Sequence, residues 1–307
     1  MVRRTVDTVP SAEHELVMAA MRAERDARAG RPPPTVAEER ASYGLIADIW
    51  PVPHDVSIMS VEVAGRPAEW VAAPGAGHGR AVLYLHGGGY VIGSLATHRD
   101  LASRVSRSSA SRVLLPDYRR APEHQFPAAL EDALGAFRWL LSQGCDPRRL
   151  AIAGDSAGGG LALATLVRLR DAGDPLPAAA VCLSPWTDLA LSGDSMQSRA
   201  IADPAVDRAT LQRWADYYLA GANARQPLAS PLYADLSGLP PVLLLVGTAE
   251  VLLDDTVRVA QRLAAAGVEV VCEQWPDLGH VFAAYATTPE AAEAAVLIGT
   301  FLREHLA

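Results

Sequence analysis

The chain has 307 residues, half of them hydrophobic, and a formal net charge of −8 at neutral pH. This length and apolar content favour one large α/β domain with an accessory cap, and the acidic balance argues against nucleic acid as a partner. All 27 basic residues are arginine, which excludes a P-loop, a Ser–Lys dyad and Schiff-base chemistry.

The three cysteines and the start of the chain indicate the environment that we expect. Cys145, Cys182 and Cys272 have neither disulfide-framework nor zinc spacing, and no His-Glu-x-x-His segment occurs, so we expect no metal and no cofactor. Buried free thiols suit a reducing compartment, which predicts a cytoplasmic protein. The first residues lack the apolar stretch of a signal peptide, and no apolar run reaches membrane-spanning length.

Two helices are predicted before the main body of the chain. Residues 11–29 carry apolar residues at helical spacing, residues 30–34 are rich in Gly and Pro, and residues 36–45 predict the second helix. Alternating apolar and polar residues over 56–63 and 68–73 then predict a β-hairpin.

From residue 80 onward, predicted strands and helices alternate, which is typical of a mostly parallel sheet with helices on both faces. The strands are expected near residues 81–85, 112–116, 149–153, 178–183, 242–246 and 268–274. The helices are expected near residues 97–109, 127–143, 157–171, 255–266 and 290–305. The stretch from about 186 to 225 interrupts this alternation, so we expect an insertion that forms part of a cap.

A nucleophilic serine is predicted at Ser156. The segment G-D-S-A-G at 154–158 follows a strand-like apolar run and precedes a helix-like run. This strand–turn–helix context exposes the serine at a sharp turn above the sheet edge. Upstream, a predicted strand runs into H-G-G-G at 86–89, whose glycines leave backbone N–H groups free to bind an oxyanion.

The histidine and the acid are expected downstream of the serine. His280 is the one histidine in a loop after Ser156, since His305 lies in a helix-like terminal segment. The acid is expected just past the strand at 242–246, and we favour Glu250. Asp254 is the alternative, although an N-cap role for the aspartates at 254–255 would already account for them.

Two further polar residues beside these motifs are assigned supporting roles. His86 precedes the serine in the chain, so we expect it to bond backbone and shape its loop rather than catalyse. Asp155 adjoins Ser156, and carboxylates at turns readily bond local backbone, which is the role we expect for it.

Taken together, these segments resemble the bacterial hormone-sensitive-lipase-like (family IV) carboxylesterases of the α/β-hydrolase fold. The matching segments are HGGGY at 86–90, DYRRAPEH at 117–124, FPAALED at 126–132, GDSAGG at 154–159, LSPWTD at 183–188 and GH at 279–280. The resemblance implies that the N–H groups of Gly88, Gly89 and Ala157 are the oxyanion donors. The family usually places its acid in a D-P-L segment, for which this chain has E-V-L at 250–252.

The resemblance also implies how the chain is divided. Residues 1–55 are expected to form the N-terminal cap helices, and residues 56–307 the catalytic domain with the cap insertion at about 186–225. Aromatic and apolar residues of these parts are the candidates for the substrate pocket, with plain packing as the alternative for each. They are Tyr43, Trp50, Met196, Ile201, Trp214 and Tyr218.

The predicted function is that of a serine carboxylesterase acting on short- to medium-chain acyl esters, lactones included. Its expected partner is a small-molecule ester substrate. An amidase or formamidase on the same triad is an alternative, as is a non-catalytic receptor on a hydrolase scaffold. The plant gibberellin receptors resemble this family but lack its catalytic histidine, so His280 counts against the receptor. A homodimer through an exposed edge strand near 268–274 is a further hypothesis.

Overall fold

The structure is a computed structural model that describes residues 2–5 and 9–306. Over these residues, nine strands form one sheet in the order β1-β9-β8-β7-β6-β4-β5-β3-β2. Their bounds are β1 Val2–Thr5, β2 Ser57–Val63, β3 Arg66–Ala72, β4 Gly77–Leu85, β5 Ser111–Pro116, β6 Leu150–Asp155, β7 Ala179–Leu183, β8 Val242–Gly247 and β9 Val270–Trp275. β2 and β3 pair antiparallel, β3 joins β5 antiparallel, and the remaining pairs are parallel.

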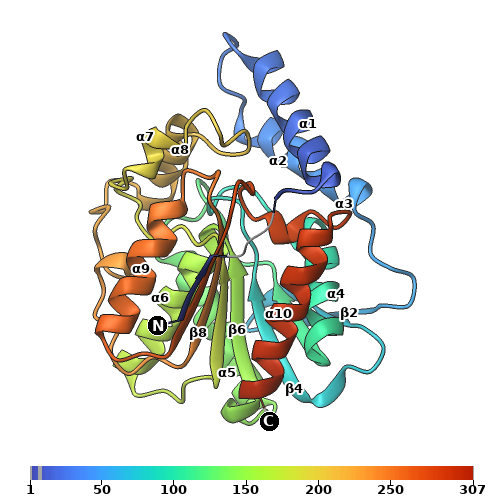
Figure 1. Cartoon of the computed structure of the whole chain (residues 1–307). Helices are drawn as coiled ribbons and strands as arrows, with labels where there is room; N and C mark the ends of the chain where they lie inside the picture. The colour runs from blue at the N-terminus through green and yellow to red at the C-terminus, as the bar shows by residue number, and fades with distance from the viewer. Residues whose placement is uncertain (1, 6–8, 307) are drawn as a thin grey trace.

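Helices cover both faces of the sheet (Figure 1). On one face, α4 (Leu95–Ser109) and α10 (Pro289–His305) pack against one buried apolar cluster. On the other face, α5 (Ala128–Ser142), α6 (Ala157–Ala172) and α9 (Leu253–Ala265) pack against a second cluster. The central strands β6, β7 and β8 are buried on both faces, which explains their unbroken apolar sequences.

The predicted α/β architecture is confirmed. Each strand and helix expected from residue 80 onward is present within a few residues of its predicted bounds, and so are the hairpin and both N-terminal helices. The pairing of β4 with β6 and of β6 with β7 brings sequential βαβ units side by side.

The expectation that the strand near 268–274 is an open edge is wrong. β1 pairs parallel with β9, so that Val2 lies opposite Val271 and Thr5 opposite Gln274. Four residues carry too little periodicity to be recognised as a strand, and their partner lies at the far end of the chain. The edge strands of the described sheet are β1 and β2, so the homodimer hypothesis loses the open edge on which it rested.

The helices outside the sheet layers lie at one end of the molecule (Figure 1). They are α1 (Ala12–Arg28), α2 (Val36–Gly44), α3 (Ile46–Ile49), α7 (Ser195–Ser198) and α8 (Arg208–Leu219). Glu39 of α2 pairs with Arg213 of α8 and accepts a 3.0 Å hydrogen bond from the indole of Trp214. We propose that the N-terminal helices and the insertion form one cap, and β1 shows that the first residues belong to the sheet instead.

Within the part of the chain that the structure describes, no helix combines the length and the apolar character needed to cross a bilayer.

Candidate active site

Ser156 lies in a strained turn between β6 and α6. Its backbone has φ 51° and ψ −122°, a region that residues with a Cβ rarely occupy. The turn also needs glycine at two neighbouring positions. A Cβ on Gly158 would lie 1.9 Å from the carbonyl oxygen of Leu85, and one on Gly154 would lie 2.4 Å from the carbonyl oxygen of Gly158. The local sequence therefore produces the sharp turn that the G-D-S-A-G pattern predicts.

The structure brings Ser156, His280 and Glu250 together in one chain of hydrogen bonds. The Oγ of Ser156 lies 3.0 Å from Nε2 of His280. The Nδ1 of His280 lies 2.7 Å from Oε2 of Glu250. An ionised carboxylate can only accept, so Nδ1 of the histidine donates to it and Nε2 is left to accept from the serine. This geometry fits a nucleophile, its base and the acid that orients the base.

Glu250 is fully buried and is held by donors on both oxygens. Its Oε1 accepts from the hydroxyl of Ser184 at 2.8 Å and from the N–H of Gly247 at 2.7 Å. Burial lowers the pKa of His280, but the hydrogen bond to Glu250 and the nearby charges of Glu250 and Asp203 outweigh it. The pKa of His280 is therefore raised above its ordinary value of 6.5.

The two aspartates after Glu250 act elsewhere. Asp254 accepts a 2.9 Å hydrogen bond from the N–H of Ser195 and has no contact with His280 among the described residues. Asp255 is buried and accepts from the N–H groups of Thr187 and the following residue, both at 2.8 Å. The predicted N-cap role is wrong, because α9 begins at Leu253 and both carboxylates lie in its first turn and bond to the insertion.

Three backbone N–H groups beside the predicted motifs have no acceptor among the described residues. Gly88 and Gly89, in the loop after β4, have φ values of +107° and +60°, which favour glycine. In the described part of the chain, the N–H groups of Gly88, Gly89 and Ala157 have no hydrogen-bond acceptor. Such groups are suited to a negatively charged oxygen. A Cβ on Gly89 would lie 2.1 Å from the ring of Trp214, so the cap packs directly on this loop.

The loop that carries these glycines is shaped by buried polar groups. The Nδ1 of His86 lies 2.8 Å from the carbonyl oxygen of Gly87, and its ring stacks on Tyr118 with centroids 4.0 Å apart. Burial lowers the pKa of His86 to about 3, so the ring is neutral. This agrees with the supporting role expected for His86.

Asp155 bonds the backbone of this loop, which is far away in the chain, whereas a bond to the local backbone of its own turn was expected. Its Oδ1 accepts from the N–H of Gly87 at 3.1 Å and from the hydroxyl of Tyr84 at 2.9 Å. Its other oxygen lies 3.4 Å from Nε2 of His98. The contact of His98 with Asp155 was not predicted from the sequence, which indicated only that His98 lies at the start of a helix. The one available signal was that His98 lies on the buried face of that helix.

The histidine loop is tied to the cap by contacts that sequence reasoning also missed. The Nε2 of the buried His14, in α1, accepts a 3.2 Å hydrogen bond from the N–H of Gly279. Burial lowers the pKa of His14, which keeps its ring neutral and able to accept. The hydroxyl of Tyr285 donates to the carbonyl oxygen of His280 at 2.8 Å. No local pattern marks His14, because its partner lies 265 positions away.

Three of the six candidate pocket residues lie against parts of this site. Trp214 packs on Gly89, as described above. The ring of Tyr43 lies 6.3 Å from that of His98, between centroids. Trp50 stacks on Tyr285 at 5.9 Å, next to the histidine loop.

The other three lie in different surroundings. Met196 and Tyr218 are buried in the apolar cluster beneath α5, α6 and α9, and Tyr218 stacks on Tyr90 with centroids 3.9 Å apart. Ile201 is 89% exposed, and its carbonyl oxygen accepts from Arg25 of α1. Packing thus accounts for Met196 and Tyr218.

Among the described residues, no group of three or more His, Cys, Asp or Glu side chains could hold a metal ion. Cys182 and Cys272 lie buried in their strands, and Cys145 is half-buried.

Comparison with known proteins agrees with the fold. The sequence pattern of the α/β-hydrolase fold family matches residues 82–284. An acetyl-hydrolase of Streptomyces hygroscopicus is 48% identical over 272 residues, which cover 88% of this chain and 89% of the relative. An esterase of Acinetobacter venetianus is 33% identical over 82% of this chain and 84% of its own length.

Solved structures agree as well. The crystal structure of an esterase from the bacterial hormone-sensitive lipase family superimposes with a TM-score of 0.93 at 47% identity, covering 98% of this chain and 100% of that one. The esterase EstE5 superimposes with the same TM-score at 45% identity, covering 96% and 99%. The chain is a carboxylic ester hydrolase that belongs to the α/β-hydrolase fold family and, within it, to the bacterial hormone-sensitive lipase family of esterases.

Proposed function

We propose that the chain hydrolyses short- to medium-chain acyl esters, lactones included, with Ser156 as nucleophile, His280 as general base and Glu250 as the acid. The observation that carries this proposal is the pair of contacts at His280, 3.0 Å to the serine oxygen and 2.7 Å to the glutamate oxygen. The order of the three residues in the chain is that of α/β-hydrolases.

In the proposed reaction, the Oγ of Ser156 attacks the ester carbonyl carbon while Nε2 of His280 takes the hydroxyl proton. Glu250 keeps Nδ1 protonated and stabilises the imidazolium that forms. His280 then gives its proton to the leaving alcohol oxygen as the carbon–oxygen bond breaks. A water molecule, deprotonated by the same histidine, hydrolyses the acyl-enzyme and restores the serine.

The negative charge on the former carbonyl oxygen is assigned to the N–H groups of Gly88, Gly89 and Ala157. Their lack of acceptors supports this role. The donors are backbone groups fixed by the fold, so they need no rearrangement as the charge develops. Loss of one such donor costs about 10²–10³-fold in rate in other hydrolases.

Two observations support a short acyl group. The similar protein of Streptomyces hygroscopicus is named an acetyl-hydrolase. In this chain, Trp214 packs directly on Gly89 beside the oxyanion donors, which leaves little room for a long chain at that point. Trp214, Tyr43 and Trp50 are the aromatic residues we propose for the pocket, because they lie against parts of the site.

The test is hydrolysis of p-nitrophenyl esters from acetyl to palmitoyl, with Ser156→Ala measured alongside. We expect turnover to peak among the short chains and to fall to background in the variant. Full turnover by Ser156→Ala would contradict the assignment of the nucleophile. A matched set of p-nitroanilides distinguishes the amidase alternative, which predicts faster cleavage of the anilides, and binding without turnover is the outcome that the receptor alternative predicts.

A further inference from the structure

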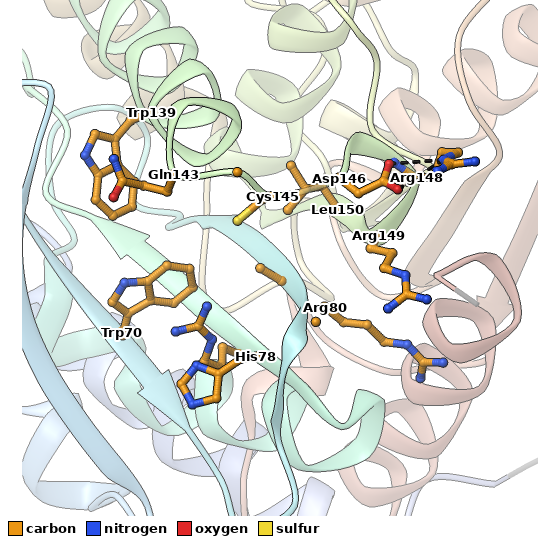
Figure 2. Close-up of a pocket in the computed structure, with 14 residues that line it drawn as sticks. Trp70, His78, Arg80, Trp139, Gln143, Cys145, Asp146, Arg148, Arg149 and Leu150 are labelled. Carbon is orange, nitrogen blue, oxygen red and sulfur yellow. Dashed lines mark hydrogen bonds and ion pairs between the residues drawn. The ribbon is translucent and has the colours of Figure 1, made fainter.

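A cavity of about 660 Å³ lies at the end of the sheet where β4, β5 and β6 begin (Figure 2). Its wall includes Leu150, the first residue of β6, whereas Ser156 follows the last residue of the same strand. At about 3.3 Å per residue, this strand separates the cavity from the serine by about 20 Å. The cavity is therefore distinct from the candidate active site at Ser156.

The wall of this cavity is strongly basic in an otherwise acidic chain. Four arginines line it, and Asp146 is the one carboxylate among its lining residues. Asp146 is already paired with Arg148 at 2.7 Å. In the described part of the chain, Arg80, Arg112 and Arg149 have no ion pair with a carboxylate. One carboxylate does not balance four guanidinium groups, which repel one another, and a bound anion relieves that repulsion.

Strand register brings two of these arginines to corresponding positions. Ala81 of β4 lies opposite Leu150 of β6, so Arg80 and Arg149 immediately precede paired residues on neighbouring strands. The Nη1 of Arg149 lies 3.2 Å from the place that a Cβ on Gly79 would take. Figure 2 shows both guanidinium groups extending from the same end of the cavity. Two such groups can grip one oxyanion with several charge-assisted hydrogen bonds.

The other end of the cavity is aromatic. Trp70 and Trp139 lie there with centroids 6.3 Å apart, separated in Figure 2 from Arg80 and Arg149 by Cys145. Arg112 stacks its guanidinium 4.3 Å from the centroid of Trp70, and among the described residues its buried Nε has no hydrogen-bond partner. Flat rings and a guanidinium plane of this kind pack well against a planar ring.

We propose that this cavity binds an organic phosphate that carries a planar ring. Arg80 and Arg149 hold the phosphate, and the ring lies against Trp139 and Arg112. A phosphate is favoured over a carboxylate because its double negative charge matches two guanidinium groups. The cavity volume lies within the range of about 300–1,000 Å³ that is usual for small-molecule sites.

The test is calorimetric titration of the full chain with adenosine monophosphate at constant ionic strength. We expect saturable binding that weakens by about tenfold or more in each of Arg80→Gln and Arg149→Gln, since each removes charge-assisted hydrogen bonds. Arg138→Gln is the matched control. It removes the same charge from α5, but Arg138 pairs with Asp174 at 2.6 Å and does not line the cavity, so the affinity should not change.

Two further probes separate the phosphate from the ring. Adenosine and inorganic phosphate should each bind more weakly than adenosine monophosphate, and Trp139→Ala should weaken the nucleotide but not inorganic phosphate. Circular dichroism and thermal unfolding establish that each variant is folded. The proposal is overturned if the nucleotide does not bind at millimolar concentration, if adenosine or inorganic phosphate binds as tightly, or if folded Arg80→Gln and Arg149→Gln keep the full affinity.

Discussion

The buried carboxylate of Glu250 is fixed in place by three hydrogen bonds. Ser184, Gly247 and His280 supply its hydrogen bonds, so both oxygens are occupied and the negative charge faces the imidazole. Glutamine at this position keeps the size of the side chain but loses its charge. Its amide oxygen would take the place of Oε1, which accepts from Ser184 and Gly247, so the amide nitrogen would face His280 and could not accept a hydrogen bond from it. The tautomer of His280 that carries its proton on Nδ1 is then no longer stabilised.

We therefore expect Glu250→Gln to lower kcat/KM by about 10³–10⁴-fold, the loss found when a triad aspartate is replaced by its amide. Asp254→Asn is the matched control, because Asp254 bonds Ser195 and does not reach the histidine. Its activity should stay near that of the parent chain in the same ester assay. A larger loss in Asp254→Asn than in Glu250→Gln would reverse the assignment of the acid.

If His280 is the general base, as proposed, its raised pKa should set the acid limit of activity. The general base must be neutral, so activity is lost as pH falls through the pKa of His280 in the free enzyme. Since Glu250 and Asp203 raise that pKa, the acid limb of kcat/KM should lie above pH 6.5. A pH–rate profile on p-nitrophenyl acetate measures it, and a limb below that value would mean that burial outweighs the two carboxylates.

At the level of elements, the elbow (the turn at residues 154–158) packs closely against the end of β4, from which the oxyanion loop (the proposed donor loop at residues 86–89) continues. Gly158 lies so close to Leu85 that a methyl group would overlap the carbonyl oxygen. Gly158→Ala should therefore shift α6 away from β4, destabilise the fold by about 1–3 kcal/mol and sharply lower turnover. Thermal unfolding and kcat are the measurements, and Gly44→Ala, where a Cβ meets nothing within 4 Å, is the control.

Helix α1 also has a predicted effect on catalysis, through His14. Loss of its bond to the N–H of Gly279 frees the loop that carries His280. We expect His14→Leu to lower kcat by about tenfold with little change in KM, since a misplaced base affects the transition state more than substrate binding. His14→Gln, which keeps an acceptor, should recover part of kcat. Equal losses in kcat from both variants would indicate a purely structural role.

The elements predicted from the sequence are those with a local signal. Apolar runs marked β6, β7 and β8, and turn glycines marked the elbow. β1 escaped because four residues give no periodicity, and the first turn of α9 was mistaken for a cap because its aspartates bond distant segments instead of their own helix.

The same distinction applies to the site. The contact between Ser156 and His280 could be predicted, because motif and chain order single out these two residues. His14, His98 and Ser184 could not, since their partners lie 265, 57 and 66 positions away. Contacts between residues so far apart in the chain form only in the folded protein, and no local pattern in a single sequence predicts them.

At the scale of the whole molecule, the sheet has no free edge at β9, where β1 completes it. The homodimer stays a prediction, but β9 cannot form its interface by edge pairing because β1 already pairs with it. Light scattering at micromolar concentration tests it, and a monomeric mass would contradict it.

The two halves of the proposed catalytic machinery depend on the proposed cap to different degrees. The serine and the oxyanion loop are held together by contacts between β4, β6 and α6, whereas the loop of His280 is held partly by His14 of α1. An ester too bulky to fit beneath the cap would have to displace α1, and that displacement removes a hydrogen bond from the loop of the base. Large esters on a lipid surface or a polymer would thus meet an intact nucleophile with a weakened base, so exclusion by size and loss of reactivity follow from a single movement.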